Sequence, residues 1–219
     1  MIELYYSPGA CSFVPHVGLE MVREATGQTF EAKLIKLHRG EHRTPEYLAI
    51  NPEGQVPTLV IDGKVLTQIV SMCDFLDRSH PQVGLLPADH WARAQALSTL
   101  AWFNNTAHPT FTHVFMPNKF AETDACQAEV KRLGRDRYLE LLTRINGMLA
   151  ARSGSFWLGE KLSVLDAYAL TLLRWGSIAG IDPESLPAYH AYVQGVAQAK
   201  PVAEAIERER LQLNMFRKA

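Results

Sequence analysis

Cysteine and surplus charge are both scarce in this sequence of 219 residues. It contains three cysteines, Cys11, Cys73 and Cys126, an odd number without regular spacing. This argues against a disulfide framework and against a zinc site of the CxxC type, and we expect no metal. The 22 Lys and Arg nearly balance the 23 Asp and Glu, which gives a net charge of -1. Because nucleic-acid phosphates require a basic face, we expect no nucleic-acid partner.

Long apolar runs are also missing. No segment approaches the roughly 20 consecutive apolar residues that a membrane-spanning helix needs, so we expect no membrane partner. The first residues enter a strand pattern directly, without the basic and then apolar segments of a secretory signal, and we expect a cytoplasmic protein. With 47% hydrophobic and 21% charged residues, the composition is that of a soluble protein of one large or two small domains.

The first eighty residues alternate between strand and helix patterns. The strands are expected at residues 2–6, 30–37, 58–61 and 64–66, and the helices at residues 13–25 and 68–78. The Asp62-Gly63 pair between the last two strands is a strong hairpin signal. The resulting order is βαβ followed by ββα, which predicts an α/β domain with a small mixed sheet covered by helices.

From residue 91 onward, only helical periodicity is found. Residues 165–173 are apolar almost all round, as expected for a helix inside a bundle. Ser163 and Asp166 precede this helix with the spacing of a capping box, so we interpret Asp166 as a structural cap rather than a catalytic acid. We predict an α/β domain at residues 1–80, a linker at 81–90 and an all-α domain at 91–219.

Cys11 is the first candidate for chemistry. It follows a short loop containing Gly9 and precedes a predicted helix, where free N–H groups and the helix dipole favour a thiolate. The alternative is a small apolar residue packed under the loop. Because no second cysteine follows at CxxC spacing, any redox cycle would need an external thiol. Ser12 is a second donor at this position, or a cap of the first helical turn.

Val56-Pro57 is the second candidate feature. A proline between a loop and a strand is a suitable place for a cis peptide bond. A cis bond would turn the N–H and C=O of Val56 outward, where a ligand backbone can pair with them as a short strand would. The alternative is a trans proline at the start of a strand.

Three segments together resemble the cytosolic glutathione transferases. They are residues 5–12 (YYSPGACS), residues 48–57 (LAINPEGQVP) and the capping box before Ala167-Tyr168. The Cys11 signature is similar to the bacterial beta class, and the resemblance covers essentially the whole chain. It implies a thioredoxin-like N-terminal domain, an all-helical C-terminal domain and a homodimer. It also implies glutathione as co-substrate in the cleft between the domains.

The resemblance also assigns roles to individual residues. Cys11 would face the glutathione sulfur and His108 would project into the site as a second catalytic residue. Val56 would pair with the cysteinyl backbone, Gln68 would hold the γ-glutamyl end and Arg39 would meet the glycyl carboxylate. The complete glutathione-binding set would be Tyr6, Ala10, Ser12, Arg39, Gln55, Val56, Pro57, Gln68, Ile69 and Asn105. The second substrate would lie on apolar residues of the helical domain such as Phe111 and Phe115.

The pattern around His108 agrees in part with this role. His108 continues a helical face that includes Asn104, and Pro109 cannot donate to the carbonyl of Asn105. A freed carbonyl, an amide and an imidazole at one kink would form a polar pocket wall. The alternative is a surface histidine that ends a helix.

Ile69 departs from the family pattern. The family usually has Ser or another small residue after this Glu or Gln, where a hydroxyl and an N–H bind the γ-glutamyl carboxylate. Loss of a hydrogen bond to a charged group costs about 1.5–3 kcal/mol, a ten- to hundredfold loss of affinity. We expect weaker glutathione binding, and more so if the branched side chain blocks the ligand.

Three functions are therefore open. The first is a glutathione transferase for electrophilic small molecules, with mixed-disulfide chemistry at Cys11 as an additional activity. The second is a binding protein on the same fold, motivated by Ile69, that has lost efficient catalysis. The third is a monothiol oxidoreductase. The identity of the second substrate is not readable from apolar residues alone.

Overall fold

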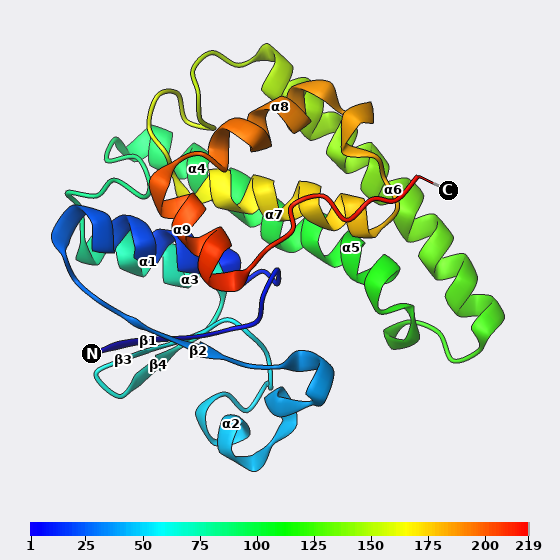
Figure 1. Ribbon diagram of the computed structural model, residues 1–219, viewed down its shortest axis with the longest axis horizontal. Helices are drawn as coiled ribbons and strands as arrows, with labels where there is room; N and C mark the ends of the chain where they lie inside the picture. Colours follow the sequence, from blue (N-terminus) through cyan, green and yellow to red (C-terminus); the bar gives the residue numbers. More distant parts are fainter. Residues whose placement is uncertain (219) are drawn as a thin grey trace.

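The computed structural model describes residues 1–218, and a mixed four-stranded sheet organises its N-terminal part (Figure 1). The strands are β1 (Ile2–Tyr6), β2 (Glu31–Leu34), β3 (Thr58–Ile61) and β4 (Lys64–Leu66), in the order β2-β1-β3-β4. The β1 and β2 strands run parallel, whereas β3 is antiparallel to both β1 and β4. The predicted mixed sheet is confirmed, although β2 ends at Leu34 because the chain then turns into two short 3-10 helices, η1 (Leu37–Arg39) and η2 (Glu41–Arg43).

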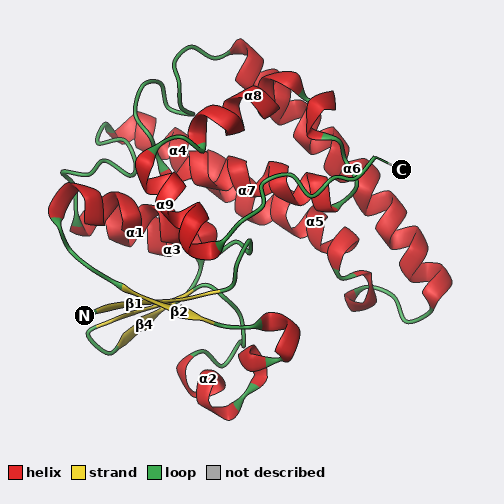
Figure 2. Ribbon diagram, viewed as in Figure 1, coloured by secondary structure: helices red, strands yellow, loops and turns green. Residues whose placement is uncertain are grey.

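Helices cover both faces of this sheet (Figure 2). The α1 (Phe13–Thr26) and α3 (Ile69–Ser79) helices lie on one face, and α2 (Pro45–Ile50) lies on the other (Figures 1 and 2). The sequence patterns missed α2, which has only six residues. Its start carries a recognisable signal, since Thr44 caps the Tyr47 N–H at 3.4 Å and Pro45 occupies the first turn.

The remainder of the described chain is helical. The helices are α4 (His90–Trp102), α5 (His108–Phe115), α6 (Asp124–Ala151), α7 (Val164–Ile178), α8 (Pro187–Val196) and α9 (Lys200–Glu209). A π-helical turn, η3 (Phe103–Ala107), joins α4 to α5, and the 3-10 turns η4 (Pro117–Lys119) and η5 (Pro183–Ser185) complete the set. No helix within residues 1–218 combines the length and the apolar character needed to cross a membrane.

The α7 helix runs through the centre of the helical part and is buried on nearly every side, as its apolar sequence predicts (Figure 1). One core extends from the sheet through α1 to α7 and α9, and includes Leu4, Phe13, Leu165 and Val202. Residues 80–89 contain no helix or strand. The domain limits of 1–80, 81–90 and 91–219 stay a prediction.

The start of α7 confirms the structural interpretation of Asp166. One oxygen of this carboxylate accepts hydrogen bonds from the N–H and the hydroxyl of Ser163, each at 2.7 Å. The other oxygen accepts from the Trp157 N–H at 2.7 Å and from the Tyr192 hydroxyl at 2.5 Å. With four donors and no solvent exposure, Asp166 ties α7 to the preceding loop and to α8.

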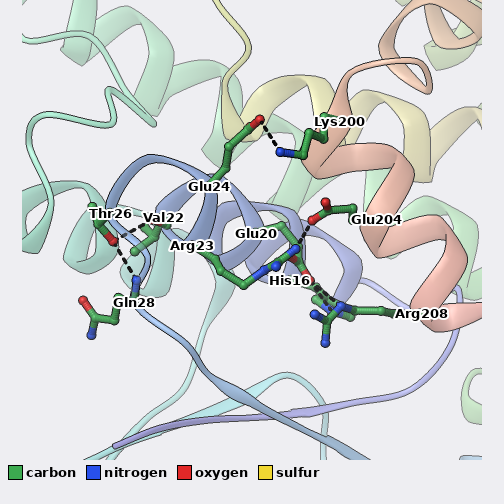
Figure 3. A network of polar contacts seen from close by, with 10 residues as sticks. All are labelled: His16, Glu20, Val22, Arg23, Glu24, Thr26, Gln28, Lys200, Glu204 and Arg208. Carbon is green, nitrogen blue, oxygen red and sulfur yellow. Dashed lines mark hydrogen bonds and ion pairs between the residues drawn. The ribbon is translucent and has the colours of Figure 1, made fainter.

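The C-terminal α9 helix is fastened to α1 by a polar network (Figure 3). Arg23 on α1 pairs with Glu204 on α9, and also with Glu20 at 2.6 Å. Arg208 on α9 reaches the buried Glu20 at 2.8 Å, and Lys200 reaches Glu24 at 3.3 Å. The α9 helix therefore supports the helix at whose start Cys11 lies.

Candidate functional site

The loop before Cys11 is held in shape by hydrogen bonds of the Ser12 side chain. The Ser12 hydroxyl has no solvent exposure, accepts from the Ser7 N–H at 3.1 Å and donates to the Ser7 carbonyl at 3.1 Å. We predicted that Ser12 binds the ligand or caps the first helical turn, and its side chain forms no such cap. Its proton and one of its two acceptor lone pairs are used to shape the loop.

Gly9 anchors the same loop to the helical part of the protein. Its N–H donates to Glu209 of α9 at 2.9 Å. Its carbonyl accepts from the Trp175 indole N–H at 2.9 Å and from Arg174 at 3.3 Å, both on α7. The φ angle of Gly9 is +68°, a backbone region that favours glycine. The position of the Cys11 loop therefore depends on residues up to 200 positions away.

Glu209 is itself held by a buried histidine. Its second oxygen lies 2.7 Å from Nδ1 of His16, and both side chains are closed to solvent. The Glu209 carboxylate thus connects α1, α9 and the Cys11 loop. Neither the contact with Gly9 nor the contact with His16 has a local sequence signal.

Cys11 lies half-buried against the backbone of the Val56 loop. Its thiol donates to the Val56 carbonyl at 3.5 Å. Burial raises the pKa of the thiol to about 12, and the N–H groups of Cys11 and Ser12 oppose this shift only in part. A carbonyl acceptor also favours the protonated form. The prediction of a thiolate at the helix start was therefore wrong for the free protein, in which Cys11 is a neutral thiol.

The Val56–Pro57 peptide bond is cis, as predicted. The Val56 N–H donates to no acceptor within residues 1–218, while its carbonyl faces the Cys11 thiol. The preceding Gln55 carbonyl accepts from the Tyr47 hydroxyl at 2.6 Å and from the Asn51 amide at 2.9 Å. The Gln55 side chain is exposed and Pro57 is buried. The hydrogen bonds to the Gln55 carbonyl thus fix the loop, and the Val56 N–H remains as an unpaired backbone donor.

The start of α3 turns the Ile69 side chain away from the position in which it could block a ligand. The Ile69 side chain is only 4% exposed and packs in the core beside Met72 and Cys73. Its backbone N–H is one of the helix-start donors that precede the first α3 hydrogen bond, from Met72 to Gln68. Gln68 is exposed and has φ +71°, which is unusual for a residue other than glycine.

A cleft of about 350 Å³ opens between the Ser7-Pro8 loop and the end of β2. Its remaining lining residues are Leu34, Lys36, His38 and Arg39. The exposed Arg39 takes part in no ion pair within residues 1–218, while Lys36 lies 3.9 Å from Glu41. Sequence reasoning placed Arg39 here and missed Lys36, the second cation of the cleft. Two cations in one cleft favour an anionic ligand group.

His108 lies half-buried at the junction of η3 and α5. Its Nδ1 is 3.1 Å from the Tyr168 hydroxyl, which donates to Oδ1 of Asn104, also at 3.1 Å. Burial lowers the pKa of His108 to about 4, so the imidazole is uncharged at neutral pH. The predicted Asn105 is exposed, and the Asn104 amide is the only hydrogen-bond partner of its side chain among the described residues. The structure therefore links Asn104, rather than Asn105, to His108.

Trp175 connects His108 to the Cys11 loop. Its indole N–H donates to Gly9, and its ring lies 4.7 Å from the His108 ring. The pKa of Tyr168 lies well above its ordinary value because of burial and, to a smaller extent, because Cys11 lies near it. The structure therefore brings Cys11 and His108 to one site, although they are far apart in the sequence.

Four other predicted site residues differ in how far they are buried. Phe111 is 6% exposed and stacks on Trp175 at 4.9 Å, so it supports the site from inside, whereas Phe115 is 59% exposed. Tyr6 is buried in the core against the His16 ring at 5.2 Å, and burial raises the pKa of its phenol. Ala10 remains half-buried in the loop beside Cys11.

No group of three or more His, Cys, Asp or Glu side chains within residues 1–218 is arranged to hold a metal ion. The groups predicted to form the site are a neutral thiol, an unpaired backbone N–H, a helix start, two cations and an uncharged imidazole. Such an arrangement can bind an anionic peptide-like thiol through its backbone and its carboxylates.

Comparison with known proteins identifies relatives over nearly the whole chain. The sequence profile of the glutathione S-transferase N-terminal domain matches residues 17–79. Glutathione S-transferase GST-4.5 of Xanthomonas campestris pv. campestris is 31% identical over 213 residues, which cover 96% of this chain and 100% of that protein. A sphingomonad glutathione S-transferase complexed with glutathione is 32% identical, with a TM-score of 0.81 over 96% of this chain and 100% of that one. The beta-class glutathione S-transferase of Sphingomonas chungbukensis is 29% identical, with a TM-score of 0.82 and the same coverage. The chain therefore belongs to the glutathione S-transferase family of enzymes.

Proposed function

We propose that this enzyme conjugates the glutathione thiol to electrophilic small molecules. The observation that carries the proposal is the pairing of the Cys11 thiol with the Val56 carbonyl at 3.5 Å, beside an unpaired Val56 N–H. A peptide ligand that pairs with this backbone edge would have its cysteinyl sulfur beside Cys11. The sphingomonad relative, whose structure holds glutathione, supports this choice of ligand.

The remaining parts of the site suit the two charged ends of glutathione. The γ-glutamyl carboxylate would meet the helix-start N–H groups at Ile69, beside Gln68. The glycyl carboxylate would meet Arg39 and Lys36 in the cleft. Because the Ile69 side chain is turned into the core, it removes a hydroxyl from the site without filling it.

The high pKa of Cys11 suits a role as hydrogen-bond donor. A thiol that stays protonated can turn its S–H from the Val56 carbonyl to a glutathione thiolate and stabilise that charge. The thiolate would attack an electrophilic carbon, form a C–S bond, and release a leaving group with its electron pair or, in an addition, leave a carbanion that takes a proton. The exposed Phe115 offers an apolar contact for the electrophile.

The same pKa argues against thiol-disulfide exchange as the main activity. With a pKa of about 12, roughly one Cys11 in 10⁵ would be a thiolate at pH 7, and the thiolate is the attacking species in exchange. The monothiol oxidoreductase reading is thereby weakened. The reading as a binding protein that has lost catalysis was motivated by Ile69. Because the Ile69 side chain lies in the core, only the loss of the hydroxyl remains as a reason for it.

We further propose that the protein is a beta-class homodimer of the cytoplasm that acts in detoxification. Similarity to the Sphingomonas chungbukensis protein supports the class. Exposed apolar residues on neighbouring elements, Val65 on β4 and Phe75 on α3, offer a surface for a second copy.

A glutathione titration by calorimetry and a conjugation assay with a chlorodinitrobenzene test the main proposal. We expect binding and turnover by the native enzyme, and a larger loss of turnover in Cys11→Ala than in Cys11→Ser, which keeps a donor. Cys126→Ala is the matched control, because Cys126 is exposed and lies on α6. Absence of binding at millimolar glutathione would refute the proposal.

A further inference from the structure

We propose that Tyr168 is a positioning residue that holds His108 in the tautomer with its proton on Nδ1, so that Nε2 is left as a proton acceptor for the glutathione thiol. The inference rests on the proposed function, and it concerns a residue that the sequence patterns placed only in the helix core. Tyr168 lies in the second turn of α7, whereas His108 begins α5.

The assignment follows from counting protons. A phenol has one proton, and the Tyr168 hydroxyl donates it to Oδ1 of Asn104 at 3.1 Å. Nδ1 of His108 lies 3.1 Å from the same hydroxyl oxygen. Because that oxygen has only lone pairs left to offer, Nδ1 must carry the proton of this second hydrogen bond. A neutral imidazole with a proton on Nδ1 has none on Nε2.

Asn104 is oriented by its own second contact. Its Nδ2 donates to Oδ1 of Asn105 at 3.1 Å, so its Oδ1 faces Tyr168. The π-helical turn that contains Asn104 ends where His108 begins, and both residues face the same phenol. Such turns inside helices often mark functional sites.

Tyr168 is held rigidly enough to impose this choice. Its side chain has no solvent exposure, and its ring packs edge-on against Phe103 at 5.7 Å. The pKa of its phenol lies well above the ordinary value because of burial, so the hydroxyl keeps its proton throughout the physiological range. The low pKa of His108 keeps the imidazole neutral until a ligand is present.

The other imidazole nitrogen, Nε2, is available to accept a proton. Nε2 of His108 has no hydrogen-bond partner within residues 1–218, and it is not fully closed to solvent, unlike the unpaired Nε2 of His16. When glutathione binds, the proton of its thiol can pass to Nε2, leaving a thiolate beside an imidazolium. The opposite charges raise the pKa of His108 in this pair, and Tyr168 continues to accept from Nδ1.

Tyr168→Phe tests the proposal because it keeps the ring and removes the hydroxyl. We expect kcat to fall about tenfold, the equivalent of one hydrogen bond, while KM for glutathione changes less than twofold. The acid limb of the pH profile of kcat should also move. Tyr189→Phe is the matched control, since it removes another fully buried phenol, which donates to the Ala169 carbonyl at 2.6 Å. It should lose comparable stability and keep kcat within twofold.

A spectroscopic measurement decides the tautomer without any substrate. In ¹⁵N spectra of the native enzyme, His108 should show a protonated Nδ1 and an unprotonated Nε2. Tyr168→Phe should shift the signals towards a mixture. Asn104→Leu removes the acceptor of the phenol, which can then donate to Nδ1, so we expect the proton on Nε2 and a reduced kcat with Tyr168 intact.

Two results would overturn the proposal: a native spectrum with the proton on Nε2, or a Tyr168→Phe enzyme with unchanged kcat and pH profile. If the native enzyme conjugates no electrophile, the proposed function fails. The tautomer measurement still reports separately whether Tyr168 sets the protonation of His108.

Discussion

Replacing Gly9 by alanine should uncouple the Cys11 loop from α7. A β-carbon on Gly9 would lie 2.6 Å from Cζ of Arg174, too close for any ordinary contact. Because the guanidinium is the far end of a flexible side chain, we expect Arg174 to move rather than the backbone. The movement would break its hydrogen bonds to the Gly9 carbonyl at 3.3 Å and to the Gln212 carbonyl at 2.9 Å.

The expected loss of folding stability in Gly9→Ala has two parts. The φ of +68° costs an alanine about 1–2 kcal/mol relative to glycine. The loss of two hydrogen bonds adds about 1–3 kcal/mol, at roughly 0.5–1.5 kcal/mol for each. Gly27→Ala isolates the first part, because Gly27 has φ +76° and its β-carbon would meet no atom within 4 Å. We therefore expect Gly9→Ala to destabilise the protein by about 1–3 kcal/mol more than Gly27→Ala.

Urea unfolding at one fixed protein concentration measures both variants. The Arg174→Ala background completes a double-mutant cycle, in which Gly9→Ala should cost no more than Gly27→Ala. Equal destabilisation by the two alanines in the native background, or an additive cycle, would show that Arg174 does not hold Gly9. In the conjugation assay, Gly9→Ala should also lower kcat/KM, because Cys11 lies two residues away.

Two further predictions concern protonation. Because burial raises the Cys11 pKa to about 12, alkylation by iodoacetamide at pH 7.5, followed by peptide mass spectrometry, should modify Cys11 at least tenfold more slowly than the exposed Cys126; faster labelling of Cys11 would contradict the assigned pKa. Because the folded protein holds the His108 pKa near 4, against an ordinary 6.5, the unfolded chain binds the extra proton between these values. Stability should therefore fall as pH drops through this window, by up to about 3 kcal/mol at pH 4 and below. Denaturant unfolding at pH 7 and pH 4 should show this loss in the native protein and a smaller one in His108→Gln; an equal loss in both would place the titrating group elsewhere.

The features that the sequence predicted well are those that depend on residues close together in the chain. The hairpin of β3 and β4 follows from Asp62-Gly63, and its limits agree with the structure. The cap at Asp166 needs only Ser163 three residues earlier, and the cis bond before Pro57 needs only the change from loop to strand. In each case a short-range geometric requirement selects one residue type.

The features that were missed depend on distant parts of the chain. Glu209 meets Gly9 across 200 positions, and Tyr168 meets His108 across 60. No spacing rule joins such pairs, because they depend on how α7 and α9 pack against the Cys11 loop. The wrong thiolate prediction has the same origin: a helix start favours the charged thiol locally, and tertiary burial opposes it more strongly.

At Ile69, the direction in which the side chain points has more effect on the binding site than the residue type. In the sequence motif, isoleucine replaces a small or hydroxyl-bearing residue, so it removes a hydroxyl and adds a bulky side chain. In the structure the bulk packs beside Met72 and Cys73, so only the hydroxyl is lost and the backbone N–H remains. The predicted penalty therefore reduces to one hydrogen bond, which a second donor of the same helix start can offset. An apolar first residue also strengthens the attachment of α3 to the core, and this holds the donors of the helix start in place for an anionic ligand.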